Sequence, residues 1–270
     1  MSNAIEKNFV VDTTDQRLKT VKDLLEADGH KVQVFEQGKV YPQTPNARHI
    51  FIFPPYVPID YKIAEVLSPG GIVFGLGCFD QEAKQILKNK NITAFFYNND
   101  EVLLMKNAYL TAEGALAALI NNTPKAIKTQ KILILGYGRV GKALAGLLDD
   151  FRAKVCVATN DEREYAHASI YVHHTYTLED FDKDLAEFDA VINTVPKLIL
   201  KGERLQHIRK DAFVIDLASW PGGVDMDAAK ELGLNVMHYL GVPTKTAALT
   251  AGQYLYESVK KALDKVDKRI

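Results

Sequence analysis

The stretch that decides the fold is Gly136-Tyr137-Gly138-Arg139-Val140-Gly141. An apolar run at 132–135 precedes it, and residues 142–148 after it have the apolar spacing of a helix. This order of strand, glycine turn and helix is typical of a dinucleotide-binding βαβ unit. Gly136 can make the tight turn, Gly138 lets the backbone approach a pyrophosphate, and Gly141 lets the helix pack closely on the strand. All six residues are therefore predicted to contact a nucleotide cofactor.

Strands and helices are predicted to alternate on both sides of this stretch. Before it, apolar runs predict strands at 8–11, 31–35, 49–53, 71–75 and 93–96. After it, similar runs predict strands at 154–158, 170–173, 189–193, 213–216 and 235–238. Helical segments separate these runs, and such alternation is typical of α/β domains with a mostly parallel sheet.

The pattern predicts two domains. Residues 108–246 are expected to form a Rossmann doubly wound parallel sheet, preceded by a second, smaller flavodoxin-like α/β domain at 1–107 on the substrate side. A helix of small residues that opens at Thr111 is predicted to connect them, so a cleft is expected nearby. The last helix, at about 247–270, is predicted to cross back to the N-terminal domain.

Composition and charge exclude several classes of protein. Of the 270 residues, 47% are hydrophobic and 25% are charged, as is usual for a soluble globular protein. A formal net charge of −1 and the lack of a long apolar run give no reason to expect nucleic acid or a membrane as partner. With a polar N-terminus and only Cys78 and Cys156, both expected to be buried and reduced, the sequence predicts a cytoplasmic protein. No Cys/His cluster has metal-ligand spacing, so no metal site is expected.

The end of the second strand of the Rossmann domain bears on the choice of cofactor. NAD sites usually carry an acidic residue there, which holds the ribose 2′-hydroxyl. This position reads Ala158-Thr159-Asn160, and Arg163 follows shortly after. Neutral hydrogen-bonding groups beside an arginine suit a 2′-phosphate, so NADP is favoured. NAD stays open, because Asp161 could hold the ribose if the strand ended one residue later, and Thr159 and Asn160 are also ordinary helix-capping residues.

Three further loops follow strands at the edge where open parallel sheets bind their ligands. The loop residues predicted to contact the cofactor are Thr194, Val195 and Pro196 after the fourth strand and Ala218 after the fifth. In the loop after the fifth strand, Gly222 and Gly223 are expected to leave backbone N–H groups free for an anionic or carbonyl ligand. The loop after the sixth strand, at 241–246, offers Lys245 as a cation.

Several motifs along the chain occur together in one known family. The longest is Asp216-Leu217-Ala218-Ser219-x-Pro221-Gly222-Gly223-Val224-Asp225. The shorter ones are Asn193-Thr194-x-Pro196, Thr111-Ala112-Glu113-Gly114, Thr250-Ala251-Gly252-Gln253 and the N-terminal turn Asp15-x-Arg17. In this order, and over nearly the whole chain, they resemble the family of the dipicolinate synthase A-subunit.

The resemblance implies an activity and partners. It implies a two-domain, nicotinamide-dependent oxidoreductase that converts a cyclic dihydrodipicolinate-type dicarboxylate to pyridine-2,6-dicarboxylate during sporulation. It also implies a second, flavoprotein-like subunit, and a homo-oligomer is expected. The wider architecture is similar to D-2-hydroxyacid and alanine dehydrogenases. The chain departs from the family pattern at Thr13-Thr14, Leu110 and Leu249.

A dicarboxylate substrate needs cations or free N–H groups at both ends. The candidates are Arg17, Lys245 and the Gly222-Gly223 backbone, with Ser219 and Thr111 as hydrogen-bond partners. Catalytic roles are assigned to Ser219, Lys245 and Glu113, the last as a proton acceptor. Two alternatives stay open: Arg17 could be a surface charge at a helix start, and Glu113 could be an acid that complements the dipole of a helix N-terminus.

Two functions remain open at the level of sequence. One is an NAD(P)-dependent oxidoreductase of the dipicolinate synthase type, or of another small carboxylate. The other is a sensor or scaffold subunit that binds NAD(P) without turnover, which the departures at Leu110 and Leu249 favour. No histidine lies where 2-hydroxyacid dehydrogenases carry their general acid, which argues against simple ketone reduction.

Overall fold

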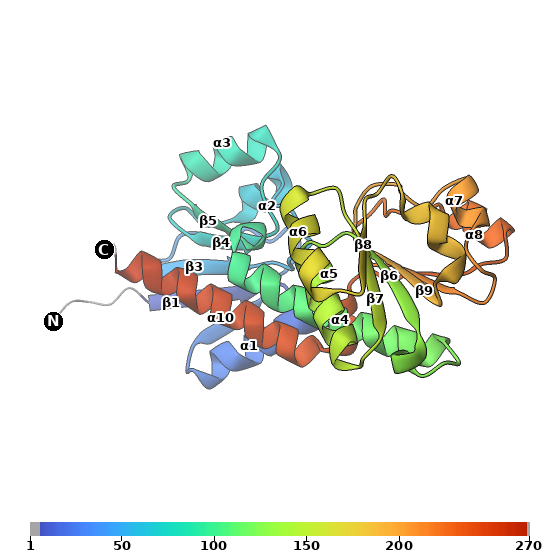
Figure 1. Ribbon diagram of the computed structural model, residues 1–270. Coiled ribbons are helices and arrows are strands. Elements are labelled where there is room, and N and C mark those ends of the chain that lie inside the picture. Colours follow the sequence, from blue (N-terminus) through green and yellow to red (C-terminus); the bar gives the residue numbers. More distant parts are fainter. Residues whose placement is uncertain (1–5, 269–270) are drawn as a thin grey trace. The chain divides into compact units, whose positions relative to one another are not determined.

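The computed structural model describes residues 6–268, so the outermost residues of the two predicted domains, 1–5 and 269–270, lie outside it. The chain divides into two compact units. The N-terminal unit comprises the residues up to Lys106 and those from Ala247 onward, and the Rossmann unit comprises Asn107–Thr246 (Figure 1). Among the described residues, no helix is both long enough and apolar enough to cross a membrane.

The N-terminal unit is built on a parallel sheet with the strand order β2-β1-β3-β4-β5. This is the strand order of flavodoxin-like domains, as predicted. The strands are β1 (Glu6–Val11), β2 (Lys31–Val34), β3 (Ala47–Ile52), β4 (Ile72–Gly75) and β5 (Thr93–Phe96). The helices are α1 (Gln16–Ala27), α2 (Tyr61–Val66), α3 (Gln81–Asn89) and α10 (Ala248–Asp267).

Both faces of this sheet are covered, because successive strand residues point to opposite sides. In β1, Phe9 and Val11 belong to one apolar cluster and Val10 to another. Helices α1 and α10 lie side by side over the first cluster, and α2 and α3 contribute to the second (Figure 1). Gly252 allows the close approach of α10, because a Cβ there would lie 2.6 Å from the carbonyl oxygen of Arg17.

The Rossmann unit is built on a parallel sheet with the strand order β11-β10-β9-β6-β7-β8. Counted from β6, this is the doubly wound order 3-2-1-4-5-6 read from the other edge, as predicted. The strands are β6 (Lys131–Leu135), β7 (Lys154–Ala158), β8 (His174–Tyr176), β9 (Ala190–Asn193), β10 (Phe213–Asp216) and β11 (Asn235–His238). The helices are α4 (Glu101–Asn122), which contains the boundary between the units, α5 (Arg139–Asp150), α6 (Glu162–Tyr171), α7 (Glu203–Gln206), α8 (Met226–Glu231) and α9 (Val242–Thr246).

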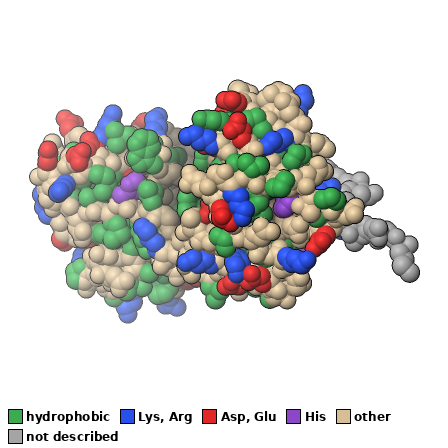
Figure 2. Space-filling model, turned by 180° about the vertical axis from the view of Figure 1, so that it is seen from behind, with side chains coloured by type: hydrophobic (Ala, Val, Ile, Leu, Met, Phe, Trp, Pro, Cys, Tyr) green, Lys and Arg blue, Asp and Glu red, His purple; other side chains and the backbone are tan. Residues whose placement is uncertain are grey.

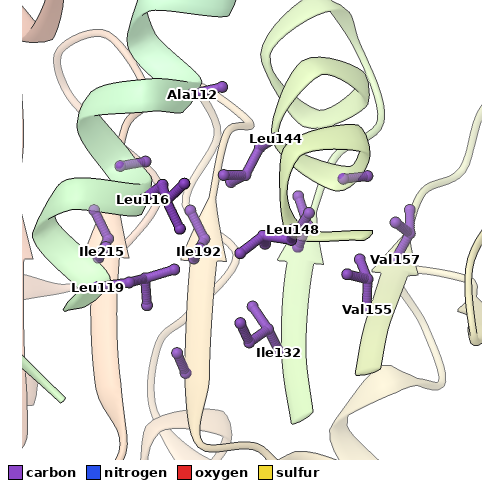
Figure 3. Packing of buried hydrophobic residues seen from close by; sticks show 14 of the residues in the cluster. Ala112, Leu116, Leu119, Ile132, Leu144, Leu148, Val155, Val157, Ile192 and Ile215 are labelled. Carbon is purple, nitrogen blue, oxygen red and sulfur yellow. The ribbon is translucent and has the colours of Figure 1, made fainter. Parts of the chain in front are cut away.

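Helices α4 and α5 pack on one face of this sheet. In Figure 3, Leu116 and Leu119 of α4 and Leu144 and Leu148 of α5 converge on Ile192 of β9. The opposite face of the sheet is covered by α7, α8 and the 3-10 helix Phe181–Glu187. Each fully buried side chain of this size contributes about 1.5–3 kcal/mol. The sheet is thus fixed from both sides, and the ends of its strands are held in register.

Three sequence-based assignments in the Rossmann unit are wrong. The segment 170–173, predicted as a strand, contains the end of α6, and β8 begins only at His174. The segment around Thr111 does not open a helix, because α4 already begins at Glu101 and continues through it. The loop at 241–246 contains the short helix α9, whose buried Val242 anchors it to the unit.

The two thiols differ in burial. Cys156 is buried as predicted, and this burial raises the pKa of its thiol to about 11. Cys78 is only half-buried, which corrects the prediction, and its thiol donates a hydrogen bond of 3.7 Å to the carbonyl oxygen of Asp80. Burial again raises its pKa, so both thiols are held in the protonated form at neutral pH.

The surface carries charges of both signs. On the face drawn in Figure 2, Lys and Arg side chains lie interspersed with Asp and Glu. Several charged side chains pair, as in the contacts between Lys106 and Glu257 at 2.5 Å and between Lys260 and Asp28 at 2.7 Å. Exposed pairs of this kind contribute about 0–1 kcal/mol each, so they do not define the fold.

Candidate functional site

The glycine turn between β6 and α5 has the geometry that its sequence predicts. Gly136 has a φ of +91°, a left-handed conformation that L side chains rarely adopt. A Cβ on Gly141 would lie 2.2 Å from the carbonyl oxygen of Gly136, so only glycine allows the first turn of α5 to approach the strand so closely. The N-cap of α5 is Gly138, which has no side chain to cap the helix. The N–H groups of the first turn can therefore bind phosphate oxygens.

The space above Gly138 is open. This residue is exposed, and the nearest heavy atom to a Cβ built on it is Oε1 of Glu164, at 3.9 Å. A pyrophosphate could therefore approach the backbone here, and the turn fits the group that the sequence predicts. Arg139 is exposed and Val140 is half-buried, whereas the Tyr137 ring is buried against His167, with 5.7 Å between ring centroids. Tyr137 can thus contribute to the site mainly through its backbone.

The loop after β9 lies against the glycine turn. The backbone N–H and the hydroxyl of Thr194 both donate to the carbonyl oxygen of Leu135, at 2.9 Å each. A Cβ on Gly136 would lie 2.5 Å from Oγ1 of Thr194 and 2.7 Å from Cγ2 of Val195. The predicted cofactor residues of this loop, including the exposed Pro196, therefore lie where strand order reverses between β6 and β9, the usual ligand site of such sheets.

The residues after β7 are already engaged. Thr159 is buried and donates its hydroxyl to Oε2 of Glu164 at 2.9 Å. The amide of Asn160 donates to Oε1 of Glu179 at 2.7 Å, and its oxygen accepts the backbone N–H of Leu178 at 2.7 Å. The donors expected to be free for a 2′-phosphate are thus bound to carboxylates, which corrects the sequence prediction.

Asp161 and Arg163 complete this corner. Strand β7 ends at Ala158, and Asp161 is the N-cap of α6, where its carboxylate accepts the backbone N–H groups of Arg163 and Glu164 at 3.0 and 2.9 Å. The strand does not continue one residue further, so the condition under which Asp161 was expected to hold the ribose is not met. Arg163 is exposed at the start of α6.

The sequence reasoning missed the residue that organises the loop after β10. Asp216 is completely buried, and its carboxylate accepts the backbone N–H groups of Ala218 at 3.1 Å, Gly223 at 2.7 Å and Val224 at 3.2 Å. It also accepts Nδ2 of Asn193 at 2.8 Å. An acidic residue at the end of an otherwise apolar strand is the signal that could have identified it.

This arrangement corrects the prediction for Gly222 and Gly223. Their N–H groups are not free, because Gly223 donates to Asp216 at 2.7 Å and Gly222 donates to the carbonyl oxygen of Ser219 at 2.8 Å. The glycines are needed for space instead. A Cβ on Gly222 would lie 2.6 Å from Oδ2 of Asp216, and one on Gly223 would lie 2.3 Å from Nδ2 of Asn193.

The other predicted residues in the loops after β10 and β11 differ in exposure. Ser219 is exposed, whereas Ala218 is buried and its carbonyl oxygen lies 3.1 Å from Nε2 of His238. His238 therefore holds the loop, a role the sequence reasoning did not assign. Lys245 is exposed on α9, and its ammonium lies 5.2 Å from the ring centroid of Tyr239. The cation–π contact fixes a charge that remains accessible to an anion.

Two predicted residues lie inside α4 rather than at its start. The hydroxyl of Thr111 donates to the carbonyl oxygen of Asn107 at 2.9 Å and is half-buried. Glu113 is exposed in the interior of the helix, so the alternative in which it complements a helix N-terminus is wrong. Gly114 is buried, and a Cβ there would lie 2.1 Å from Cγ1 of Val242.

In the N-terminal unit, Arg17 forms a buried ion pair. Its Nε and Nη2 donate to the two carboxylate oxygens of Asp15 at 3.0 and 2.7 Å, and both residues are less than a tenth exposed. The alternative in which Arg17 is a surface charge is therefore wrong. Burial alone would raise the pKa of Asp15, but the hydrogen bonds and charge of Arg17 lower it below its ordinary value.

The phenol of Tyr97 belongs to the same buried region. It has no hydrogen-bond partner within the described chain, and its pKa is raised by burial and by the charge of Asp15, which Arg17 opposes. The two bonds to Asp15 use only part of the donors of a guanidinium. Arg17 therefore retains donors beyond those that Asp15 uses. Residues 6–268 contain no cluster of His, Cys, Asp and Glu able to hold a metal ion.

Comparison with known proteins locates this fold among oxidoreductases. Residues 105–221 match the family described as D-isomer specific 2-hydroxyacid dehydrogenase, NAD binding domain. The A-subunit of dipicolinate synthase from Bacillus subtilis is 30% identical over 173 residues, which cover 63% of this chain and 57% of that relative. The match therefore spans little more than half of the relative's length.

Two solved structures share the whole arrangement. The A chain of dipicolinate synthase from Bacillus subtilis is 20% identical, with a TM-score of 0.82 over 100% of both chains. The corresponding chain from Bacillus halodurans is 22% identical, with a TM-score of 0.80 over 96% of this chain and 98% of that one. These likenesses show the fold, and the sequence match supplies the relationship. The resemblance predicted from the motifs is thereby confirmed: the chain is similar to the A-subunit of dipicolinate synthase, and its residues 105–221 match an NAD-binding domain of the 2-hydroxyacid dehydrogenase type.

Proposed function

We propose that this protein is an NAD(P)-dependent oxidoreductase of the dipicolinate synthase type, which oxidises a dihydrodipicolinate-type cyclic dicarboxylate to pyridine-2,6-dicarboxylate. The observation that carries the proposal is the open glycine turn at Gly138, which the neighbouring loops leave accessible at the reversal of strand order. The kinship to a dipicolinate synthase chain supports the choice of substrate.

The reaction is a two-electron oxidation that makes the ring aromatic. The dihydropyridine loses a hydride and a proton, and a bound nicotinamide supplies the hydride acceptor. The chain must therefore position the ring and remove the proton. Asp216 fixes the loop that carries Ser219, whose exposed hydroxyl is proposed to bind the substrate. Glu113, exposed on α4, is the proposed proton acceptor.

The two carboxylates of the substrate require cations. Arg17 is proposed to bind one of them, because its guanidinium is held rigidly by Asp15 and retains donors beyond those bonds. Lys245 is proposed to bind a carboxylate from the Rossmann unit, where Tyr239 orients its ammonium. Gly222 and Gly223 act here only by shaping the loop, since their N–H groups are used internally.

The test is the formation of reduced nicotinamide from dihydrodipicolinate, followed by absorbance with NAD and with NADP. Lys245→Ala should lower turnover at least tenfold, because a substrate carboxylate loses a charge-assisted contact. Lys230→Ala is the matched control, since this lysine is exposed on α8 away from the strand ends that form the site, and its activity should equal that of the wild type. Full activity of Lys245→Ala would refute this residue's role.

A second, flavoprotein-like subunit is proposed as partner, since the name of the relative marks it as one of several subunits. The assay is therefore run with and without such a partner, and activity that appears only in the mixture would identify the requirement. Light scattering of the purified chain tests the expected homo-oligomer.

A second candidate function is a sensor or scaffold subunit that binds nucleotide without turnover. Two departures from the family pattern favour it: Leu110 is buried inside α4, and Leu249 is exposed at the start of α10. Nucleotide binding without reduction of NAD or NADP, with the partner protein present, would support this function over the first.

A further inference from the structure

Rossmann domains that bind NAD usually have an acidic residue at the end of the second strand. Here a carboxylate lies at the end of β7, but it comes from the helix that follows. Thr159 follows the strand directly and is 4% exposed, so its hydroxyl requires a partner. Oγ1 of Thr159 donates to Oε2 of Glu164 at 2.9 Å. Glu164 lies in the first turn of α6, and the acid therefore reaches the strand end from the following helix.

The other oxygen of Glu164 faces the glycine turn. Its Oε1 lies 3.9 Å from the position of a Cβ on Gly138 and is the nearest heavy atom to that position. Burial raises the pKa of Tyr137, the residue before Gly138, and the charges of Tyr171 and Glu164 raise it further. The carboxylate thus stands beside the predicted pyrophosphate position, with one oxygen held by Thr159 and the other directed to the site.

We infer that Glu164 binds the adenosine ribose hydroxyls of the dinucleotide and thereby selects NAD over NADP, with Thr159 as its positioning residue. The inference rests on the nicotinamide dinucleotide site proposed above. A carboxylate oxygen accepts hydrogen bonds from a ribose with a free 2′-hydroxyl. The same oxygen repels a 2′-phosphate, which carries negative charge and offers no such donors.

The surrounding charges act in the same direction. Asp161 caps α6, and Asn160 holds the carboxylate of Glu179 at 2.7 Å, so further acidic groups lie at this corner. The cations nearby are Arg163, exposed at the start of α6, Arg139, which follows Gly138, and Lys142, whose ammonium lies 5.6 Å from the ring centroid of Tyr137. The corner therefore favours a neutral ribose, whereas residue identities alone had favoured NADP.

The experiment is calorimetric titration of the full chain with NAD and with NADP. The wild type should bind NAD at least tenfold more tightly than NADP, as expected for one charge-assisted hydrogen bond. Glu164→Gln keeps an oxygen for the Thr159 hydroxyl but removes the charge. It should therefore weaken the binding of NAD, strengthen the binding of NADP and bring the ratio of their dissociation constants towards one. Thr159→Val, which releases Glu164, should also reduce the ratio.

Glu162→Gln is the matched control, because it removes the same charge from the same turn of α6 but two residues away, on a different side of the helix. Its ratio should stay within about twofold of the wild type, the change left by a distant, screened charge. Equal binding of the two dinucleotides by the wild type, or an unchanged ratio in Glu164→Gln, would overturn the inference and leave the proposed function intact. Binding of neither dinucleotide would overturn the proposed site and the inference together.

Discussion

At the scale of single residues, one buried carboxylate explains the shape of the site. Asp216 satisfies three backbone N–H groups and the amide of Asn193. A charge can be buried in this way when several donors share it. The hydrogen bonds that Asp216 accepts offset the cost of its desolvation, and they order the loop that carries the exposed Ser219.

Removing that carboxylate should destabilise the fold strongly. Asp216→Ala would leave buried donors without acceptors, at about 1–3 kcal/mol for each, so we expect a loss of about 3 kcal/mol or more in the free energy of unfolding. Asp225→Ala is the comparison, because this residue makes a single cap bond of 3.0 Å to the N–H of Ala228 and should cost about 1 kcal/mol. Urea unfolding measures both. Equal losses would contradict the role of Asp216.

At the scale of elements, the N-terminus of α5 differs from those of several other helices. The side chains of Asp15, Asp60 and Asp80 cap α1, α2 and α3, whereas α5 begins at a glycine. An acidic cap would compete with a phosphate for the same N–H groups. At α5 the glycine N-cap brings no side-chain acceptor to the first-turn N–H groups, which suits the binding of an anion.

This difference predicts the outcome of two glycine substitutions, one at the N-cap of α5 and one inside the helix. Gly138→Val should leave the fold intact, since Gly138 has a φ of −70° and open space around its Cβ position, but should weaken nucleotide binding at least a hundredfold. Gly146→Ala should leave binding unchanged and raise stability by about 0.5–1 kcal/mol, because nothing lies within 4 Å of a Cβ there. Calorimetry and thermal unfolding distinguish the two. Undiminished binding in Gly138→Val would refute the nucleotide site.

Helices and strands could be predicted from the sequence where the residues of the element itself determine its structure. The strand at 154–158 is observed with the predicted bounds, because a buried parallel strand reads as a continuous apolar run. The segment 170–173 misled because Ile170, Tyr171 and Val172 favour strands, yet the helix capped by Asp161 continues to Tyr171. Thr111 and Glu113 resemble the start of a helix. However, Leu110 before them is not a proline, so its backbone N–H is present and α4 continues through this segment.

The site was predictable where it depends on backbone shape and not where it depends on tertiary partners. The glycines of the β6–α5 turn are identified by spacing alone. The partner of Thr159 could not be identified in this way, because the contact with Glu164 requires a known orientation of α6 against β7. Likewise, the sequence predicts free N–H groups at Gly222 and Gly223, and only the folded loop around Asp216 shows that these groups are bound.

At the scale of the whole molecule, each unit has its own apolar cores, and each contains a buried carboxylate that pairs with a cation. In the Rossmann unit, Asp189 accepts from Lys125 at 2.6 Å and from Arg209 at 3.3 Å. In the N-terminal unit, Asp15 accepts from Arg17. Burial acts to raise the pKa of both carboxyls, but hydrogen bonds and cations lower it overall.

These shifts predict the pH dependence of stability. A carboxyl with a lowered pKa in the folded state stabilises the protein above the unfolded pKa of about 4, and this contribution is lost as the pH falls through the folded pKa. Asp189→Asn should therefore cost about 2 kcal/mol at pH 7. Its difference from the wild type should shrink progressively below pH 4. Urea unfolding between pH 7 and pH 3 measures this, and a difference that grows on acidification would contradict the sign.

The last prediction separates the roles of the two units. Arg17→Lys keeps a positive charge beside Asp15, so the N-terminal unit should stay folded, but it loses the planar fork that holds Asp15 and an incoming carboxylate together. We expect KM for the dicarboxylate to rise at least tenfold, whereas the affinity for the dinucleotide should not change, because that site lies in the Rossmann unit with a core of its own. Lys19→Ala, at an exposed position of the same helix, is the control and should alter neither value. An unchanged KM in Arg17→Lys would remove Arg17 from the substrate site, and a loss of dinucleotide affinity would show that the substitution acts through the fold.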